Sequence, residues 1–155
     1  MCGLVGAYQY SGHFNITPEY LIKMRDSMTH RGPDDAGIWI SELERIGMGH
    51  RRLSILDLSP NASQPMSNID ESIQVVFNGE IYNHAELRVE LTTIHGAKWK
   101  TDHSDTEVII KAYEAWGIDC LKRFRGMFAI ALWDSKWSLT TSRELAIIVF
   151  FNISR

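Results

Sequence analysis

The sequence predicts an α+β domain built of packed layers, because many short apolar strands are interspersed with two or three helices. Its 155 residues are enough for one domain with a core and too few for two comfortable ones. Hydrophobic residues make up 45% and charged residues 23% of the chain, as in an ordinary globular protein. The chain contains no repeats and no low-complexity linker that would divide it. We therefore expect a single layered domain.

The first third of the chain predicts three strands and one helix. An apolar run at 4–8 follows the N-terminus directly and predicts a strand. A helix should begin after Thr17, because a threonine N-cap is followed by Pro18, and proline favours the first helical position. Segments 37–40 and 46–49 are expected to pair as neighbouring strands.

The remainder of the chain alternates strands and helices. Segment 53–57 is either another short strand or the edge of a loop. A strong strand is expected at 73–77, closed by an Asn-Gly pair, and a helix at 84–91. Segment 105–116 has the spacing of an amphipathic helix, and 127–133 that of a buried strand.

Composition excludes several classes of function. The formal net charge of −3 and a pI near 6.0 provide neither a basic surface for nucleic acid nor a polybasic patch for a membrane. The six histidines lack metal-ligand spacing, so we expect no metal and no cofactor. Only two cysteines are present and the N-terminus is not a signal peptide, which predicts a reducing, cytoplasmic location.

Cys2 is the most informative residue. Removal of Met1, which is normal before a small residue, would leave a thiol and a free α-amine on one N-terminal residue. A thiolate is a strong nucleophile, and the α-amine can serve as its base. The strand expected at 4–8 would hold the thiol in place. The alternative is that Cys2 is simply the second residue of an ordinary protein.

The Asn78-Gly79 pair also has two interpretations. Asn-Gly by itself is typical of a tight turn between strands. Here the preceding strand runs towards a helix and has no obvious partner strand after it. Such a junction can direct an Asn amide and a Gly backbone N–H at one point, as an oxyanion hole requires.

Two further charged groups suit the two ends of an amino acid. Arg51 is expected to be a solvated surface residue, whereas Arg52 abuts an apolar segment and could bind a carboxylate through two hydrogen bonds. Ser104 or Asp105 is a plausible N-cap of the helix at 105–116, with Glu107 near the capping-box position. A carboxylate there could also pair with a substrate ammonium group.

Several motifs then occur in the order of a known family. They are Met1-Cys2-Gly3, His30-Arg31-Gly32-Pro33-Asp34, His50-Arg51-Arg52-Leu53-Ser54-Ile55, Gln64-Pro65-Met66, Asn78-Gly79-Glu80-Ile81-Tyr82-Asn83, Asp105-Thr106-Glu107 and Gly126-Met127-Phe128-Ala129. From residue 1 to about 133 the chain resembles the glutaminase domain of glutamine-hydrolysing asparagine synthetase. This domain is a class II glutamine amidotransferase with the four-layer αββα N-terminal-nucleophile (Ntn) hydrolase fold.

The resemblance implies catalytic roles for three residues. Cys2 would attack the side-chain amide of glutamine, with its own α-amine as base, through a water. The Asn78 side chain and the Gly79 N–H would bind the tetrahedral oxyanion.

Other residues would bind the substrate, again by resemblance. Arg52 would bind the α-carboxylate, with backbone from Ile55 and Leu56 nearby. Asp105, with help from Glu80, would hold the α-ammonium group.

Five residues are expected to be structural. Arg31 and Asp34 would shape the loop over the nucleophile, and His30 and His50 are interpreted as structural hydrogen-bonders. Cys120 is interpreted as a small core residue.

The resemblance ends near residue 135, and we assign 1–135 to the amidotransferase domain and 136–155 to a divergent tail. The Gly, the Lys-Pro step and the second Arg of the family's continuation are missing here. We expect a truncated or frame-disrupted fragment whose fold is incomplete at its C-terminal end. The apolar run at 147–151 would form a strand lacking its neighbour.

The expected function is hydrolysis of L-glutamine to glutamate and ammonia, the ammonia-supplying half of asparagine synthesis. No ATP-binding pyrophosphatase loop is found in these 155 residues, so we expect the ATP-dependent synthetase half to be absent. A homodimer or a separately encoded synthetase domain are the partners left open. The alternative is a catalytically inactive remnant with at most a binding or interaction role.

Overall fold

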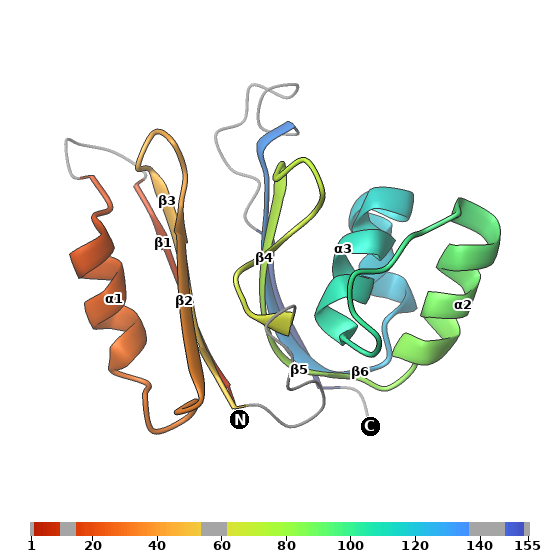
Figure 1. Ribbon diagram of the computed structural model, residues 1–155, viewed down its shortest axis with the longest axis horizontal. Helices are drawn as coiled ribbons and strands as arrows, with labels where there is room; N and C mark the ends of the chain where they lie inside the picture. The colour runs from red at the N-terminus through yellow and green to blue at the C-terminus, as the bar shows by residue number, and fades with distance from the viewer. Residues whose placement is uncertain (1, 10–14, 54–61, 137–147, 154–155) are drawn as a thin grey trace.

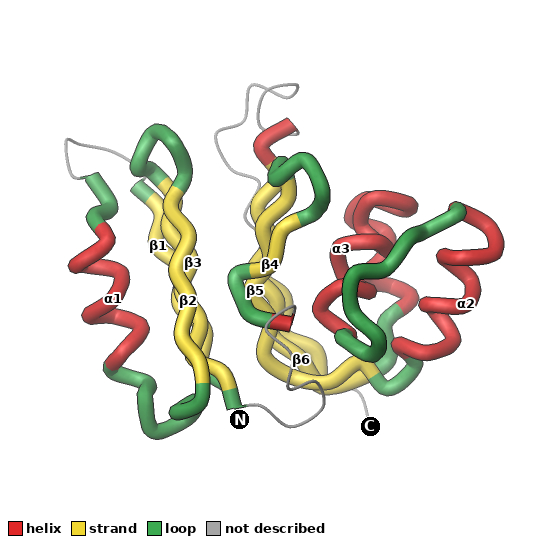
Figure 2. The backbone as a smooth tube through the Cα atoms, viewed as in Figure 1, coloured by secondary structure: helices red, strands yellow, loops and turns green. Residues whose placement is uncertain are grey.

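The computed structural model describes residues 2–9, 15–53, 62–136 and 148–153, arranged in four layers (Figure 1). A helix lies outside a three-stranded sheet, a four-stranded sheet packs behind that sheet, and two helices cover its far face (Figure 2). This is the predicted α+β, four-layer αββα architecture. None of the described helices combines the length and the apolar character needed to cross a bilayer.

The first sheet carries the N-terminus. Its strands are β1 (Gly3–Tyr8), β2 (Asp35–Ile40) and β3 (Ile46–Arg52), in the order β1-β3-β2 and all antiparallel. Gly3 pairs with Arg51, and Asp35 pairs with Arg52. The start of β1 and the end of β3 therefore lie side by side, and the three strands predicted here are confirmed.

The second sheet has the order β4-β5-β6-β7. Its antiparallel strands are β4 (Met66–Ser67), β5 (Ile73–Ile81), β6 (Gly126–Asp134) and β7 (Ile148–Ile153).

Strand β5 continues through Asn78-Gly79, so both the expected end of the strand and the tight turn are wrong at this pair. Asn78 pairs with Ala129, and Gly79 with Phe128. Gly79 has φ +149°, and a Cβ there would lie 2.1 Å from the carbonyl oxygen of Met127. Glycine is needed at this position because β6 approaches closely, not because the chain reverses direction.

Strand β7 confirms the strand predicted at 147–151, with slightly later bounds. Its residues pair with β6 from Met127↔Ile153 to Leu132↔Ile148. It is the edge strand of its sheet, and among the described residues its other side has no strand neighbour, as expected.

Three α-helices are present among the described residues. Helix α1 (Pro18–Asp26) begins after Thr17, whose side chain accepts a hydrogen bond from the Tyr20 N–H. Helix α2 (His84–His95) extends four residues beyond the predicted 84–91 and ends at Gly96, which has φ +66°. Helix α3 (Asp105–Trp116) has the predicted bounds and is followed by the 3₁₀-helix η2 (Gly117–Arg123).

The core has two parts because successive strand residues point to opposite faces. Val75 and Phe77 of β5 pack among the residues of α2 and α3, while Val76 packs towards the first sheet with Met48. Cys120 is 1% exposed in the helical part of the core, where burial raises the pKa of its thiol to about 12. Its predicted role as a small core residue is confirmed.

Candidate active site

A pocket of about 360 Å³ opens where the ends of the two sheets meet the start of α3. This volume is within the range of about 300–1,000 Å³ that is usual for small-molecule sites. Among the residues lining it are Cys2, Arg52, Asn78, Gly79, Glu80 and Asp105. Every predicted site residue that lies in the described part of the chain therefore reaches one pocket. Ile55 and Leu56 lie outside the described residues.

Cys2 is held at the start of β1 by contacts to two other segments. The Leu53 N–H donates to the Cys2 Sγ over 3.4 Å, and the thiol is 3.8 Å from the Leu53 carbonyl oxygen. Arg31 Nε donates to the Cys2 carbonyl oxygen over 3.2 Å. The expectation that Arg31 shapes the surroundings of Cys2 thus has a direct contact behind it.

Arg52 is the buried member of the Arg51-Arg52 pair, with 8% of its surface exposed. Its backbone carbonyl accepts from the Asp34 N–H, so the loop before β2 is tied to the end of β3.

Arg51 corrects an expectation, because it is not a solvated residue. Its side chain is only 12% exposed, and its Nε donates to the Gly32 carbonyl oxygen over 2.8 Å. Adjacent strand residues point to opposite faces, so Arg51 contacts Gly32 in the loop before β2 while Arg52 lines the pocket.

Phe77, the residue before Asn78 and Gly79, accepts a hydrogen bond from a side chain of the first sheet. The His50 Nε2–H donates to the Phe77 carbonyl oxygen over 3.1 Å, and His50 is 1% exposed. Burial lowers the pKa of His50 to about 4, with a smaller contribution from the Arg52 charge, so the ring is neutral at pH 7. The interpretation of His50 as a structural hydrogen-bonder is confirmed.

Asp105 is a nearly buried carboxylate in the first turn of α3, with 9% of its surface exposed. It accepts a hydrogen bond from the Ile81 N–H over 3.3 Å. Burial raises the pKa of this carboxyl, against the lowering effect of that N–H and of His84. A cation beside Asp105 would offset the desolvation of the carboxylate, which suits an ammonium group in the pocket.

Ser104 is the N-cap of α3, which leaves Asp105 available to the pocket. The Ser104 Oγ accepts from the Glu107 N–H over 3.4 Å. The Glu107 carboxylate accepts from the N–H groups of Lys100 and Thr101 instead of closing a capping box with Ser104. Glu107 therefore anchors the segment before the helix.

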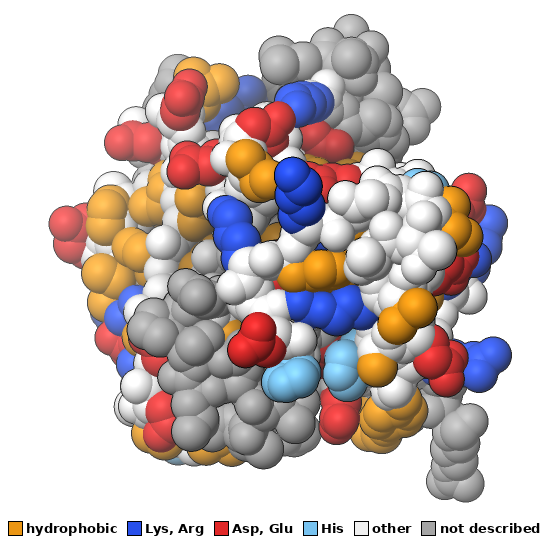
Figure 3. Space-filling model, turned by 45° about the vertical axis from the view of Figure 1, so that its right-hand side comes forward, with side chains coloured by type: hydrophobic (Ala, Val, Ile, Leu, Met, Phe, Trp, Pro, Cys, Tyr) orange, Lys and Arg blue, Asp and Glu red, His pale blue; other side chains and the backbone are white. Residues whose placement is uncertain are grey.

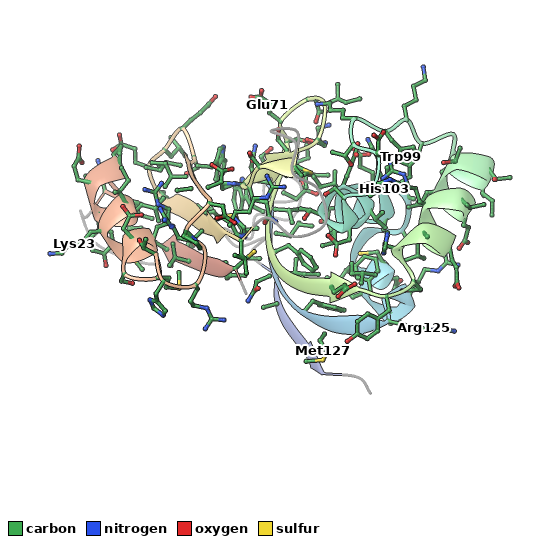
Figure 4. All side chains as sticks on the ribbon, turned by 60° about the horizontal axis from the view of Figure 1, so that its bottom comes forward. Lys23, Glu71, Trp99, His103, Arg125 and Met127 are labelled. Carbon is green, nitrogen blue, oxygen red and sulfur yellow. The ribbon has the colours of Figure 1, made fainter. Side chains whose placement is uncertain are left out.

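Several other residues that line the pocket had no predicted role in binding or catalysis. They are Leu53, Ala62, Gln64, Phe77, Tyr82, His103, Thr106 and Met127, together with the N-cap Ser104. Figure 4 shows His103 in the segment before α3 and Met127 near the start of β6. Gln64 and Tyr82 belong to the motifs identified in the sequence, and that was the signal that could have drawn attention to them.

The face of the molecule shown in Figure 3 is mixed in charge, with acidic and basic side chains interspersed with hydrophobic ones. Within the described residues, no group of three or more His, Cys, Asp or Glu side chains is placed to hold a metal ion.

Comparison with known proteins identifies the family. Residues 1–145 match the family described as "Glutamine amidotransferase domain". The chain belongs to this family. Asparagine synthetase [glutamine-hydrolyzing] 1 of Bacillus subtilis is 43% identical over 136 residues, which cover 86% of the chain. A relative from Methanocaldococcus jannaschii, also named for glutamine-hydrolysing asparagine synthetase, is 41% identical over an alignment of 157 positions that covers 90% of the chain.

A solved structure supports the fold of this glutamine amidotransferase domain. Glutamine phosphoribosylpyrophosphate amidotransferase from Bacillus subtilis superposes with a TM-score of 0.67 at 19% identity, over 85% of the chain and 35% of that protein. The chain spans 21% and 29% of the length of the two sequence relatives. The domain boundary at residue 135 stays a prediction.

Proposed function

We propose that the chain hydrolyses glutamine to glutamate and ammonia, with Cys2 as the nucleophile. The observation that supports this most is the meeting of Cys2, Arg52, Asn78-Gly79 and Asp105 in one pocket. These residues come from both sheets and from α3. Membership of the glutamine amidotransferase family is the reason to interpret them as a site for glutamine.

In the proposed reaction Met1 is removed first, so that the Cys2 α-amine can take the thiol proton. The sulfur attacks the side-chain amide carbon of glutamine, and the carbonyl oxygen becomes an oxyanion. The Asn78 side-chain N–H and the Gly79 N–H donate to that oxyanion. The C–N bond then breaks, the nitrogen takes the proton and leaves as ammonia, and water hydrolyses the thioester to glutamate.

The same proposal assigns the substrate's two charged groups. Arg52 binds the α-carboxylate through its guanidinium, together with backbone groups of Ile55 and Leu56. Asp105 binds the α-ammonium, assisted by Glu80. Both Arg52 and Asp105 are less than 10% exposed, so these charged hydrogen bonds form in a region of low dielectric.

The use of the ammonia and the cellular setting belong to the same proposal. The relatives' names suggest that this domain supplies ammonia for asparagine synthesis. We propose a cytoplasmic location, and a homodimer or a separately encoded synthetase domain as the partner.

The test combines mass spectrometry with an ammonia assay on the purified chain. We expect intact mass to show loss of Met1, and a diazo-ketone analogue of glutamine to add once, at Cys2. Cys2→Ala should abolish ammonia release, and Asn78→Ala should lower kcat by about 10²–10³-fold. Cys120→Ala is the matched control and should keep activity, because that thiol is buried. Retained Met1, or an adduct on Cys120 alone, would refute the proposal.

A further inference from the structure

Gln64 connects two elements of the candidate site through the two ends of its side-chain amide. Its Oε1 accepts from the Phe77 N–H over 2.6 Å, and its Nε2 donates to the Thr106 Oγ1 over 3.2 Å. Gln64 is 9% exposed and lines the pocket. The same side-chain amide therefore bonds Phe77, the residue before Asn78 in β5, and Thr106, the residue after Asp105 in α3.

The contact to Phe77 takes the place of a strand partner. Strand β4 is only two residues long and pairs with Gln74 and Val75 of β5. Two residues further along β5, side chains bind the Phe77 peptide groups: Gln64 accepts its N–H and His50 donates to its carbonyl. The backbone that leads into Asn78 is therefore fixed by two buried side chains.

The contact to Thr106 acts on the first turn of α3. Each of the first three residues of this helix bonds a different part of the chain. Asp105 accepts from the Ile81 N–H, Thr106 accepts from Gln64, and Glu107 accepts from the Lys100 and Thr101 N–H groups. The Gln64 bond is the one that links this turn to the residue before Asn78.

The backbone of Gln64 is packed against the first sheet. A Cβ built on Gly37 of β2 would lie 2.0 Å from the Gln64 carbonyl oxygen, so only glycine fits between them. Gln64 therefore contacts three parts of the candidate site. They are the first sheet, which carries Cys2, strand β5, which carries Asn78, and helix α3, which carries Asp105.

We propose that Gln64 is a positioning residue that sets the Asn78-Gly79 donors and the Asp105 carboxylate at a fixed separation across the pocket. This inference rests on the proposed function, in which both groups bind the same glutamine molecule. A misplacement of about 1 Å can cost about 10²-fold in rate, so loss of this link should affect catalysis beyond its effect on stability.

Asn68 provides a matched control at the other end of β5. It is also a buried amide, 7% exposed, and its Oδ1 accepts from the Ile73 N–H over 3.0 Å. Its remaining contacts, to Ser72 and Glu114, are not among the residues that line the candidate site. Gln64→Met and Asn68→Leu each remove a buried amide that accepts from β5.

Both variants should lower Tm, but only Gln64→Met should lower kcat for glutamine hydrolysis, by about 10–10²-fold. If both variants keep the kcat and KM of the unchanged chain, or if both lose activity in parallel with Tm, the positioning role is wrong.

Thr106 gives a second, milder test if Gln64→Met does not fold. Thr106→Val keeps the shape of the side chain but removes the acceptor for Gln64, and should raise KM for glutamine. Thr106→Ser keeps the hydroxyl and should restore most of the glutamine affinity that Thr106→Val loses. Equal kinetics for the Val and Ser variants would overturn the inference.

Hydrogen exchange separates this inference from the proposed function. If the unchanged chain releases no ammonia, the proposed function fails, but amide exchange measured by NMR still tests the link. Gln64→Met should speed exchange at Phe77, whose N–H loses its acceptor, and at Asn78 beside it, while Asn68→Leu should speed it at Ile73. Unchanged exchange at Asn78 in Gln64→Met would overturn the positioning role.

Discussion

The first turns of α1 and α3 have the same local ingredients and different environments. Both helices follow a hydroxyl N-cap, Thr17 or Ser104, whose oxygen accepts from the N–H three residues later. Both have an acidic residue in the first turn, Glu19 or Asp105. Yet Glu19 is exposed, whereas Asp105 is 9% exposed and lines a pocket.

The environments move the two carboxyl pKa values in opposite directions. The pKa of Glu19 is lowered by its own backbone N–H and by the Thr17 hydroxyl, which favour the charged form. The pKa of Asp105 is raised, because desolvation outweighs the hydrogen bonds that it accepts. The same helix-start motif therefore stabilises a helix at one place and carries a costly, buried charge at the other. The second arrangement is typical of a functional site.

The largest difference between the two turns should appear in kinetics. We expect Asp105→Asn to lower kcat/KM for glutamine by about 10²–10³-fold, because it removes one partner of a buried charge pair with the substrate ammonium. Glu19→Gln, the same change in the other turn, should leave kcat/KM unchanged. Steady-state ammonia release measures both variants. If Asp105→Asn keeps the kcat/KM of the unchanged chain, Asp105 does not bind the substrate ammonium.

Burial should act on His50 as it acts on Asp105, by disfavouring the charged form. The pKa of His50 is about 4 in the fold and 6.5 when unfolded, so the folded state binds fewer protons between these values. The free energy of unfolding should therefore fall by about 3 kcal/mol as the pH drops from 6.5 to 4. Urea unfolding across this range measures the loss. His50→Gln should show a shallower dependence, and an equally steep one would assign the loss to other groups.

The two N-caps should cost similar stability but differ in their kinetic effect. Thr17→Ala and Ser104→Ala should each lower the free energy of unfolding by about 1 kcal/mol, since each removes one N-cap hydrogen bond. Only Ser104→Ala should also raise KM for glutamine, because fraying of α3 displaces Asp105. Denaturant unfolding and ammonia release, measured on both variants, test this. A raised KM in Thr17→Ala would show that the kinetic effect is not specific to α3.

The smallest expected effect is an opposite pH dependence of stability for the two carboxyls. The contribution of Glu19 is present above its unfolded pKa of 4.5 and is lost as the pH falls through its lowered folded pKa. The Asp105 penalty is absent below 3.8 and grows as the pH rises through its raised folded pKa. At pH 7 we therefore expect Asp105→Asn to raise Tm and Glu19→Gln to lower it slightly. Thermal unfolding of both variants measures this, and a Tm shift of the same sign would contradict it.

The sequence was a good guide wherever the deciding interaction is local. The cap at Thr17 and the start of α3 after Ser104 depend on contacts between residues three apart. The division of β5 into Val75 and Phe77 on one face and Val76 on the other follows from the alternation of side chains along a strand. The order of the motifs identified the family, and the family implied the four layers.

Predictions failed where the deciding partner is distant in the sequence. Asn78-Gly79 has the local character of a turn, but β6, about fifty residues away, supplies a strand partner for both residues. Arg51 has the local character of a surface residue, but its Nε donates to the carbonyl oxygen of Gly32, in the loop before β2. Glu107 is a shorter-range case: it has the spacing of a capping box, but its carboxylate accepts from the N–H groups of Lys100 and Thr101, which precede the helix.

By itself, the sequence therefore determined most of the helices and strands, because propensity, capping and side-chain period are properties of neighbouring residues. The order of its motifs determined the family and named the candidate site residues. Only the tertiary structure decided which of the polar groups meet. It placed Gln64 between Phe77 and Thr106, His50 on Phe77, and the buried Asp105 beside Ile81. Those contacts depend on which strands pair and how the layers stack. Burial in that arrangement raises the pKa of Asp105 above that of an exposed carboxyl.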